Sequence, residues 1–272
     1  MLLTIDAGNT RTKWAVFSAD GVMQNYGACL NNMLTAADLS PSTLGYKRVI
    51  ISNVAGEQHA TLLSEKLSAF AIPVQWLKAS SEACDVMNRY VPPESLGCDR
   101  WAALISAWHS QLAPCVVVNA GTAVTIDALN VQNPLPHHNH RGEFIGGLIL
   151  PGLILMQQSL GLATAQLAKA SLEASATTKI HSVIFAKNTL EAIQSGALHA
   201  IIGAITLMAH ELHTLSQQSP AIIISGGNAK AIYDSLVGRV TNQVLIVDNL
   251  VLQGLYLLEN SRSTYSVQSE LQ

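Results

Sequence analysis

Thr4-Ile5-Asp6-Ala7-Gly8-Asn9-Thr10 and Val117-Val118-Asn119-Ala120-Gly121-Thr122 are the two stretches that decide the fold. Each runs from apolar residues to Asp or Asn, and then to Ala-Gly and Thr. Each predicts a strand and a glycine turn, followed by a return strand at residues 13–17 or 123–129. A repeated unit of this kind indicates internal duplication. We therefore expect two similar halves, residues 1–114 and 115–272, with a boundary near Pro114.

The rest of the chain alternates between short apolar runs and helical periodicity. Strands are expected at residues 48–53, 74–77, 142–150, 221–225 and 244–247. Helices are expected at residues 57–70, 99–112, 151–170, 188–215, 229–236 and 250–258, and Pro151 is expected in the first turn of its helix. Such alternation is typical of an α/β fold. Because a hairpin heads each half, we expect mixed sheets flanked by helices.

The amino-acid composition excludes some classes of protein and some partners. Of the 272 residues, 49% are apolar and 12% are charged, and the formal net charge is −3. The apolar content excludes a disordered chain. The lack of a basic cluster in the sequence argues against a nucleic-acid partner. The low charge content indicates that part of the surface is covered by another subunit.

The cysteines and the lengths of the apolar runs indicate the cellular location. The four cysteines form no C-x-x-C pair, which is typical of a reducing compartment. The residues after Met1 lack the basic region of a secretory signal. The longest apolar stretch, residues 144–156, is broken by Pro151 and is shorter than the roughly 18 residues of a membrane span. We therefore expect a cytoplasmic protein without a membrane partner.

Residues 6–13, Asp-Ala-Gly-Asn-Thr-Arg-Thr-Lys, carry the strongest chemical signal. A glycine turn lets the backbone approach a phosphate and direct N–H groups at it. Asp6 can face a Mg²⁺–phosphate group, Thr10 offers a hydroxyl and Lys13 a cation, as phosphoryl transfer requires. Taken alone, a plain hairpin with Asp as a turn former explains this segment equally well. The second copy at residues 119–122 favours phosphate binding.

A second candidate site lies at residues 97–100, Gly-Cys-Asp-Arg, where a helix is expected to begin. Asp99 can accept a proton from a substrate hydroxyl, and Arg100 can hold a carboxylate through two parallel hydrogen bonds. Tyr90 can line the same pocket. For Asp99 and Arg100 the alternative interpretation, which spacing alone favours, is a helix-capping Asp and a surface Arg. For Tyr90 a half-buried loop aromatic is an equally good explanation.

Two further segments have more than one interpretation. Residues 225–228, Ser-Gly-Gly-Asn, follow a strand and open a helix, where a nucleotide can bind; a simple strand–helix turn explains them as well. His137, His138 and His140 are candidate metal ligands in a polar loop. No carboxylate or cysteine accompanies them there, so a solvated hairpin tip is the favoured interpretation.

Several motifs follow one another along the chain in a specific order and spacing. They are residues 6–10 with Lys13, residues 97–101, residues 119–125, Gly146-Gly147 with Pro151-Gly152, Asn188-Thr189 with Glu191 and Gly196, and residues 225–227. Through them, most of the chain resembles the type III pantothenate kinases, which belong to the superfamily of acetate and sugar kinases, Hsp70 and actin. The resemblance implies a duplicated actin-like (ribonuclease H-like) two-lobed fold and a homodimer.

The same resemblance implies an activity and residue roles. ATP, with Mg²⁺, is implied to phosphorylate the primary hydroxyl of pantothenate to 4′-phosphopantothenate, the first step of coenzyme A biosynthesis. Asp99 is implied to be the general base. The implied ATP contacts are Asp6, Ala7, Gly8, Asn9, Thr10, Arg11, Thr12, Lys13 and Thr122. The implied pantothenate contacts are Tyr90, Gly97, Cys98, Asp99, Arg100 and Thr189, the last from the neighbouring subunit.

Asn119 departs from the family pattern, which usually has Asp there and associates that acid with a monovalent cation, K⁺ or NH₄⁺. An amide keeps a carbonyl ligand but loses the charge. Two alternatives stay open. One is a weak or inactive relative that binds nucleotide or pantothenate as a regulatory or accessory protein; Asn119 favours it, whereas Asp6, Lys13, Asp99 and Arg100 oppose it. The other is a kinase for a different small hydroxy acid.

Overall fold

The structure is a computed structural model that describes residues 1–110, 112–132, 141–163, 167, 170 and 182–269. The chain divides into two compact units: unit 1 comprises Met1–Ser110 and Asn249–Gln272, and unit 2 comprises Gln111–Asp248. The candidate metal ligands His137, His138 and His140 lie outside the described residues. Unlike the expected halves, the units place residues 249–272 with the N-terminal part of the chain. The division into two lobes near Pro114 stays a prediction.

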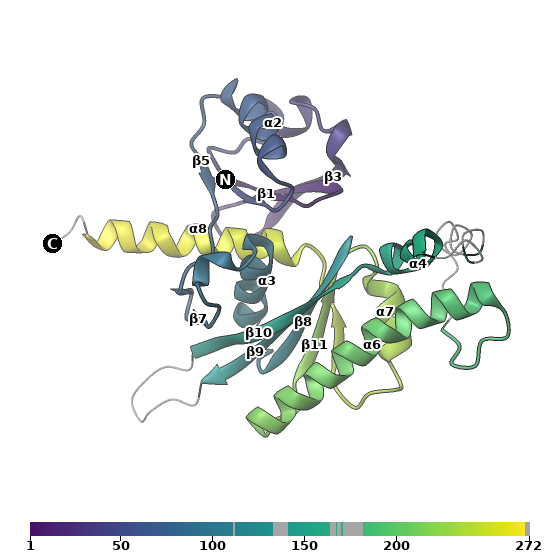
Figure 1. The fold of residues 1–272 in the computed structure, drawn as a ribbon. Helices are drawn as coiled ribbons and strands as arrows, with labels where there is room; N and C mark the ends of the chain where they lie inside the picture. Colours follow the sequence, from purple (N-terminus) through teal and green to yellow (C-terminus); the bar gives the residue numbers. More distant parts are fainter. Residues whose placement is uncertain (111, 133–140, 164–166, 168–169, 171–181, 270–272) are drawn as a thin grey trace. The chain divides into compact units, whose positions relative to one another are not determined.

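Unit 1 is built on a five-stranded sheet (Figure 1). Its strands are β1 (Leu2–Ala7), β2 (Arg11–Phe17), β3 (Met23–Leu30), β4 (Arg48–Asn53) and β5 (Val74–Trp76), in the order β3-β2-β1-β4-β5. β2 is antiparallel to β1 and β3, whereas β4 is parallel to β1 and β5. The central strand β1 is buried on both faces from Leu2 to Ile5, as expected for a covered strand, and the hydroxyl of its one polar residue there, Thr4, donates to the Ala15 carbonyl.

Unit 2 repeats this arrangement. Its strands are β8 (Cys115–Ala120), β9 (Ala123–Gln132), β10 (Arg141–Pro151), β11 (Ala221–Ser225) and β12 (Val244–Ile246), in the order β10-β9-β8-β11-β12. β9 is antiparallel to β8 and β10, whereas β11 is parallel to β8 and β12. Strand order and direction thus match those of unit 1, position for position. The predicted α/β duplication with mixed sheets is confirmed.

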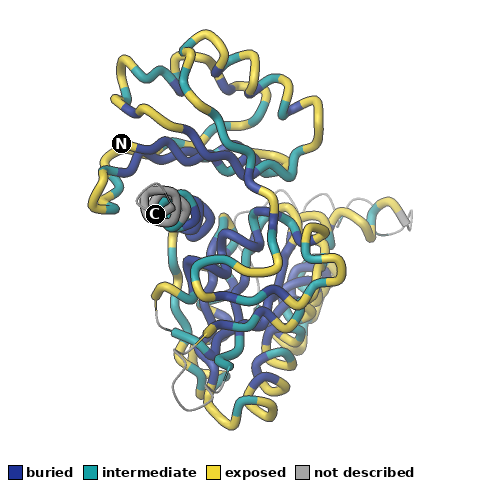
Figure 2. Tube along the Cα trace, turned by 90° about the vertical axis from the view of Figure 1, so that its left-hand side faces the viewer, coloured by how far each residue is buried: buried dark blue, intermediate teal, exposed yellow. Residues whose placement is uncertain are grey.

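The helices of unit 1 pack against the five-stranded sheet of the same unit. They are α1 (Pro41–Leu44), α2 (Glu57–Ser68), α3 (Cys98–His109) and α8 (Leu250–Ser269); the shorter elements are η1 (Asn31–Met33), η2 (Ala37–Leu39), η3 (Pro93–Ser95), β6 (Glu82–Ala83) and β7 (Val86–Asn88). The core joins Leu3 and Ile5 of β1 to Ile51 of β4 and to Leu63 and Leu67 of α2. Figure 2 shows this burial along the strands in dark blue.

Contacts of α8 explain why the end of the chain belongs to unit 1. A Cβ added at Gly254 would lie 1.8 Å from the carbonyl oxygen of Ala102 in α3, so the close packing of these helices requires glycine there. The Tyr256 hydroxyl donates to the Ala19 carbonyl at 3.0 Å, within the β2–β3 turn. Arg48 of β4 forms an ion pair with Glu259 at 3.0 Å.

The helices of unit 2 are α4 (Leu153–Ala163), α6 (Thr189–Ser216) and α7 (Ala229–Leu236). By length and composition alone, α6 could cross a membrane: it has 28 residues, and an 18-residue window has a mean hydropathy of 1.5 and is 44% buried. Its residues Leu198, Ile201 and Ile205 share a buried cluster with Val116 and Ile126 of the sheet. These contacts make α6 a core helix of unit 2.

Pro151 does not begin a helix. It is the last residue of β10, opposite Ala123 of β9, and α4 starts at Leu153. The prediction of Pro151 in a first helical turn was therefore wrong. The β9–β10 ladder continues up to the proline, which a strand tolerates at its end because no further N–H is needed there.

Candidate active site

The first hairpin turn places charged side chains at the end of β1. Asp6 lies opposite Lys13 in the β1–β2 ladder, and directly opposed residues project from the same face of a sheet. The Gly8 N–H donates to the Arg11 carbonyl at 3.1 Å and closes the turn. Residues 9–11 at its tip are exposed. The turn therefore combines accessible backbone with a carboxylate and an ammonium group.

The Asp6 carboxyl has an unusual electrostatic environment. Burial raises the pKa of Asp6 to about 7, the charge of Asp99 contributes to the increase, and Lys13 opposes it. A buried carboxyl near this pKa gains strongly from a cation that binds beside it. The structure thus brings Asp6, Lys13 and Asp99 together within unit 1.

Asp99 lies in the first turn of α3, whose N-cap is Gly97, as predicted. Its Oδ1 accepts the backbone N–H of Arg100 at 2.8 Å. Burial raises the pKa of the Asp99 carboxyl, while this hydrogen bond and the charge of Arg100 lower it. A Cβ added at Gly97 would lie 2.7 Å from Asp99 Oδ1. Glycine at this position therefore leaves room for the carboxylate.

Arg100 and Tyr90 form one buried assembly. Arg100 is only 5% exposed, so the alternative interpretation of a surface arginine was wrong. Its Nη1 donates to the Tyr90 hydroxyl at 2.9 Å, and its Cζ lies 5.2 Å from the centre of the Tyr90 ring. A guanidinium held in this way has a fixed direction for binding an anion.

Cys98 connects α3 to the end of β4. The Ser52 hydroxyl donates to Cys98 Sγ at 3.2 Å, and the thiol donates to the Asn53 carbonyl at 3.5 Å. Burial raises the pKa of the Cys98 thiol, so the thiol stays protonated at neutral pH. The side chain is engaged with β4, and it fixes the start of the helix that carries Asp99.

Thr12 is also engaged internally. Its side chain is fully buried, and its hydroxyl contacts Asn31 at 2.9 Å and His59 at 2.8 Å. The sequence analysis did not identify Asn31 or His59. No local pattern marks them, because they meet Thr12 from positions 19 and 47 residues away.

The hairpin turn of unit 2 has the same backbone plan. Asn119 lies opposite Thr125 in the β8–β9 ladder, and the Gly121 N–H donates to the Ala123 carbonyl at 3.0 Å. The exposed Thr122 lies at its tip. This turn presents an amide and a hydroxyl where the first turn presents Asp6 and Lys13.

Two glycines allow neighbouring segments to approach this second turn. The Gly152 N–H donates to the Thr122 carbonyl at 2.8 Å, and a Cβ at Gly152 would lie 2.4 Å from that oxygen. Gly226 has a φ of +103°, and a Cβ there would lie 2.6 Å from the Ala120 carbonyl. The Asn228 N–H donates to the same carbonyl at 3.1 Å. The Gly226-Gly227 segment therefore lies against the second turn at the start of α7.

Asp127 is a further polar residue that the sequence analysis missed. It is 2% exposed and lies on β9, two residues beyond Thr125. Alternation along a strand puts it on the same face as Thr125 and Asn119. The available signal was a single acid within the apolar return strand, since charged residues are rarely buried without a partner.

Thr189 lies at the N-terminus of α6, in unit 2. It follows the N-cap Asn188, whose side chain accepts the Glu191 N–H at 2.9 Å. The Glu191 carboxylate in turn accepts the Lys187 N–H at 3.4 Å. Thr189 itself is exposed, so its hydroxyl is accessible for a contact with another molecule.

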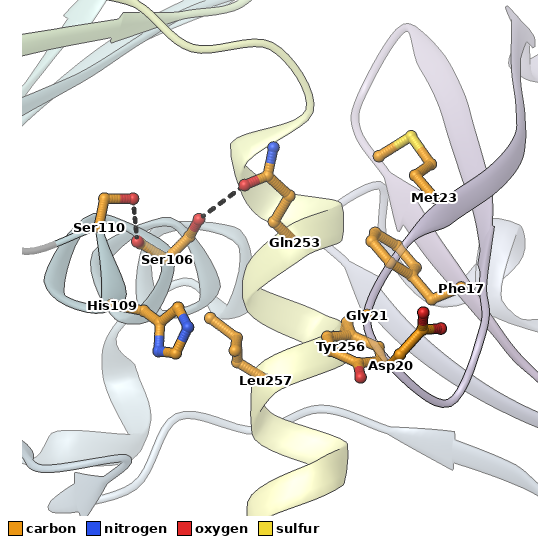
Figure 3. Close-up of a pocket in the computed structure, with 10 residues that line it drawn as sticks. All are labelled: Phe17, Asp20, Gly21, Met23, Ser106, His109, Ser110, Gln253, Tyr256 and Leu257. Carbon is orange, nitrogen blue, oxygen red and sulfur yellow. Dashed lines mark hydrogen bonds between the residues drawn. The ribbon is translucent and has the colours of Figure 1, made fainter.

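A cavity of about 330 Å³ lies elsewhere in unit 1, between the β2–β3 turn, the end of α3 and α8 (Figure 3). Polar groups of Asp20, His109 and Gln253 line it beside the stacked rings of Phe17 and Tyr256. None of the predicted site residues lines this cavity. Among the described residues, no group of three or more His, Cys, Asp or Glu side chains could hold a metal ion.

Comparisons with known proteins address the family. Residues 2–211 match the family model described as type III pantothenate kinase. A type III pantothenate kinase of Methylobacillus flagellatus is 38% identical over 95% of this chain and 97% of its own. One of Aromatoleum aromaticum is 39% identical over 94% and 96% of the two chains.

Solved structures support the fold. A Campylobacter jejuni protein of the Baf family matches with a TM-score of 0.57 and 16% identity, over 96% of this chain and 99% of its own. The ethanolamine utilization protein EutJ of Carboxydothermus hydrogenoformans matches with a TM-score of 0.50 and 11% identity, over 94% and 89% of the two chains. At these identities the likeness concerns the fold alone.

Proposed function

Because the chain belongs to the type III pantothenate kinase family, we propose that it transfers the γ-phosphoryl group of ATP to pantothenate. The acceptor is the primary hydroxyl, and the product is 4′-phosphopantothenate, for coenzyme A biosynthesis in the cytoplasm. The observation that carries this proposal is the cluster of Asp6, Lys13 and Asp99 in unit 1, beside the buried guanidinium of Arg100.

The first turn is proposed to bind the phosphates of ATP. Residues 6–13 supply backbone N–H groups and the Lys13 ammonium. The Thr122 hydroxyl is proposed as a further contact for ATP. Asp6 is suited to Mg²⁺ because its raised pKa reflects a buried carboxyl that a cation would stabilise in the ionised form. Bound Mg²⁺ would neutralise charge on the phosphates. The glycine at position 8 allows the close approach that the phosphates need.

Asp99 is proposed to act as the general base. It accepts the proton of the pantothenate hydroxyl while the hydroxyl oxygen forms a bond to the γ-phosphorus. The bond from that phosphorus to the bridging β–γ oxygen breaks, and ADP leaves. Burial, which raises the pKa of Asp99, makes the carboxylate a better proton acceptor at neutral pH.

Arg100 is proposed to bind the carboxylate of pantothenate. Its guanidinium is buried and oriented by the Tyr90 hydroxyl and ring. A charge-assisted pair in such a site favours acceptors that carry a carboxylate. Gly97 and Cys98 contribute by fixing the first turn of α3, and Thr189 is proposed to reach pantothenate from the neighbouring subunit.

Assembly as a homodimer is part of this proposal. Unit 2 exposes a group of large apolar side chains on β10 and α4, namely Leu148, Ile149, Ile154 and Leu155. Exposed apolar groups of this kind mark interaction surfaces. Sedimentation at assay concentration tests the assembly, and a fully active monomer would contradict it.

A monovalent cation, K⁺ or NH₄⁺, is proposed to bind weakly beside the second turn, because Asn119 offers a carbonyl oxygen without a charge.

The accessory-protein alternative is not favoured by any contact of the described residues. The residues proposed for phosphoryl transfer and acceptor binding are intact, which argues against this alternative; they are Asp6, Lys13, Asp99 and Arg100.

The function is tested by a coupled assay of ADP release. Pantothenate is compared with a panel of sugars and small hydroxy acids, with Mg²⁺ and ATP held constant. We expect pantothenate to give the highest kcat/KM. A higher value for another hydroxy acid would reassign the acceptor, and no turnover with any acceptor would support the accessory-protein alternative.

A further inference from the structure

Asn31 binds three consecutive carbonyl groups of the first turn. Its side-chain Nδ2 donates to the Gly8 carbonyl at 2.8 Å and to the Asn9 carbonyl at 3.1 Å. Its backbone N–H donates to the Thr10 carbonyl at 3.1 Å. One residue, which follows β3 directly and begins η1, thus holds the whole tip of the turn.

The donor and the acceptor can be assigned in each hydrogen bond that links Asn31, Thr12 and His59. Carbonyl oxygens only accept, so the Asn31 atom that faces Gly8 and Asn9 is the nitrogen. Asn31 Oδ1 therefore faces Thr12, whose hydroxyl donates to it at 2.9 Å. A hydroxyl has one hydrogen, so His59 Nε2 must donate to Thr12 Oγ1 across 2.8 Å.

The histidine is suited to this single task. His59 projects from α2, is 8% exposed, and has its pKa lowered by burial. The neutral ring has one N–H, and the contact with Thr12 places it on Nε2. Donation therefore runs one way, from His59 to Thr12, from Thr12 to Asn31, and from Asn31 to the turn.

This relay determines which way the peptide groups of the turn point. In a trans peptide the N–H points opposite to the C=O. Because the Gly8 and Asn9 carbonyls point at the Asn31 amide, the N–H groups of Asn9 and Thr10 point away from it. Successive N–H groups that share a direction form a site for an anion.

We propose that Asn31 and His59 are positioning residues that hold the first turn in its phosphate-binding conformation. The inference rests on the proposed function in one respect, namely that the turn binds the phosphates of ATP. Neither residue touches the nucleotide. Each acts on the turn through hydrogen bonds, Asn31 directly and His59 through Thr12.

Asn31→Asp removes the donor to the Gly8 and Asn9 carbonyls at nearly constant shape. A carboxylate oxygen would face the Gly8 and Asn9 carbonyls and repel them. We expect the dissociation constant for ADP, measured by titration calorimetry without any acceptor, to rise about tenfold or more, since two hydrogen bonds are lost and oxygens are opposed. The control is Asn25→Asp, the same change at an exposed position of β3, which should bind ADP normally.

His59 offers a test of direction that does not depend on Asn31→Asp folding. His59→Leu removes the donor and keeps the bulk, so ADP binding should weaken by about threefold to tenfold, as expected for one lost hydrogen bond. His59→Gln keeps an N–H donor near Nε2 and should restore most of the affinity. Thermal unfolding of both variants is measured in parallel.

The outcomes separate positioning from general stability. In steady-state assays, the KM for ATP should rise while the KM for pantothenate stays within about twofold, since Arg100 is untouched. Variants that unfold more easily but bind ADP normally would overturn the proposal, as would His59→Gln behaving like His59→Leu. If the unmodified protein binds ADP but does not phosphorylate pantothenate, the proposed function fails and the positioning role is still decided by the dissociation constants.

Discussion

The β1–β2 turn and the β8–β9 turn share one backbone plan and differ in charge. Each follows a strand that has an antiparallel neighbour on one side and a parallel neighbour on the other, and each is closed by a glycine N–H that donates across the turn. In the first, Asp6 lies opposite Lys13; in the second, Asn119 lies opposite Thr125. The duplicated fold thus supplies two equivalent turns, and the first places an acid opposite a lysine at the strand ends.

The residues around the two turns also differ, because the first turn is contacted by polar side chains and the second by backbone. The first turn is held from behind by the side chains of Asn31, Thr12 and His59. The second is enclosed by backbone that approaches at Gly152 and Gly226. We infer that the first turn carries charge-based chemistry, whereas the second contributes mainly backbone contacts.

The largest effect is expected at Asp99, the proposed general base. Asp99→Asn should lower kcat by a factor of about 10²–10⁴, the usual contribution of a positioned acid or base, and should leave ATP binding intact. Asp85→Asn makes the same change at an exposed position and serves as control. Near-normal turnover of Asp99→Asn would remove Asp99 from the role of general base.

The next largest effect is expected on the KM for pantothenate when Arg100 is changed. Arg100→Lys keeps the charge but loses the planar pair of donors and the Tyr90 contact. We expect the KM for pantothenate to rise by about tenfold to a hundredfold, with little change for ATP. Arg239→Lys, at an exposed position of unit 2, is the control. A rise in the KM for ATP instead would show that Arg100 serves the phosphates.

A smaller effect is expected from giving the second turn a charge. Two unit charges about 4 Å apart interact by roughly 4 kcal/mol at an effective dielectric near 20, much of it offset by desolvation. Asn119→Asp should therefore create or strengthen activation by potassium, measured as initial rate at fixed ionic strength with tetramethylammonium as balancing salt.

The unmodified protein is expected to need high potassium or none. Saturable activation at low potassium that Asn119→Asp does not improve would contradict the argument from charge.

The smallest effect is on stability and depends on pH. The pKa of Asp6 is raised from 3.8 to about 7 in the folded protein, so the folded state binds this proton more tightly than the unfolded state. The resulting stability is complete below pH 4 and is lost as the pH rises through about 7. Without ligands, Asp6→Asn should raise Tm at pH 8, and the gain should shrink towards pH 4. A gain that is independent of pH would contradict the raised pKa.

Sequence patterns predicted the parts of the fold that repeat or alternate. The two hairpins, the mixed sheets and the start of α3 follow from apolar runs, glycine turns and helical spacing. β3 was not predicted because it is an edge strand with exposed polar residues such as Gln24 and Asn25, so no apolar run marks it. The contact of α8 with α3 depends on Gly254 and Ala102, which lie far apart in sequence.

The candidate site was only partly accessible from sequence. Asp6, Lys13 and Asp99 stand in local motifs, and their proximity in unit 1 follows from the ends of β1 and α3. The burial of Arg100 could not be predicted, because it depends on Tyr90 and on packing around α3. The relay from His59 to Asn31 joins three separate segments, and no local spacing reveals it.

The unequal roles of the two turns are tested most directly by comparing kcat for Asp6→Asn and Asn119→Ala at saturating ATP, Mg²⁺ and pantothenate. Asp6→Asn removes a charge aimed at the metal and phosphates, and we expect a loss of about 10²–10³, as for other preorganised electrostatic groups. Asn119→Ala removes a neutral dipole, and we expect a loss below about tenfold. An equal or larger loss for Asn119→Ala would contradict the assignment of the charge-based chemistry to the first turn.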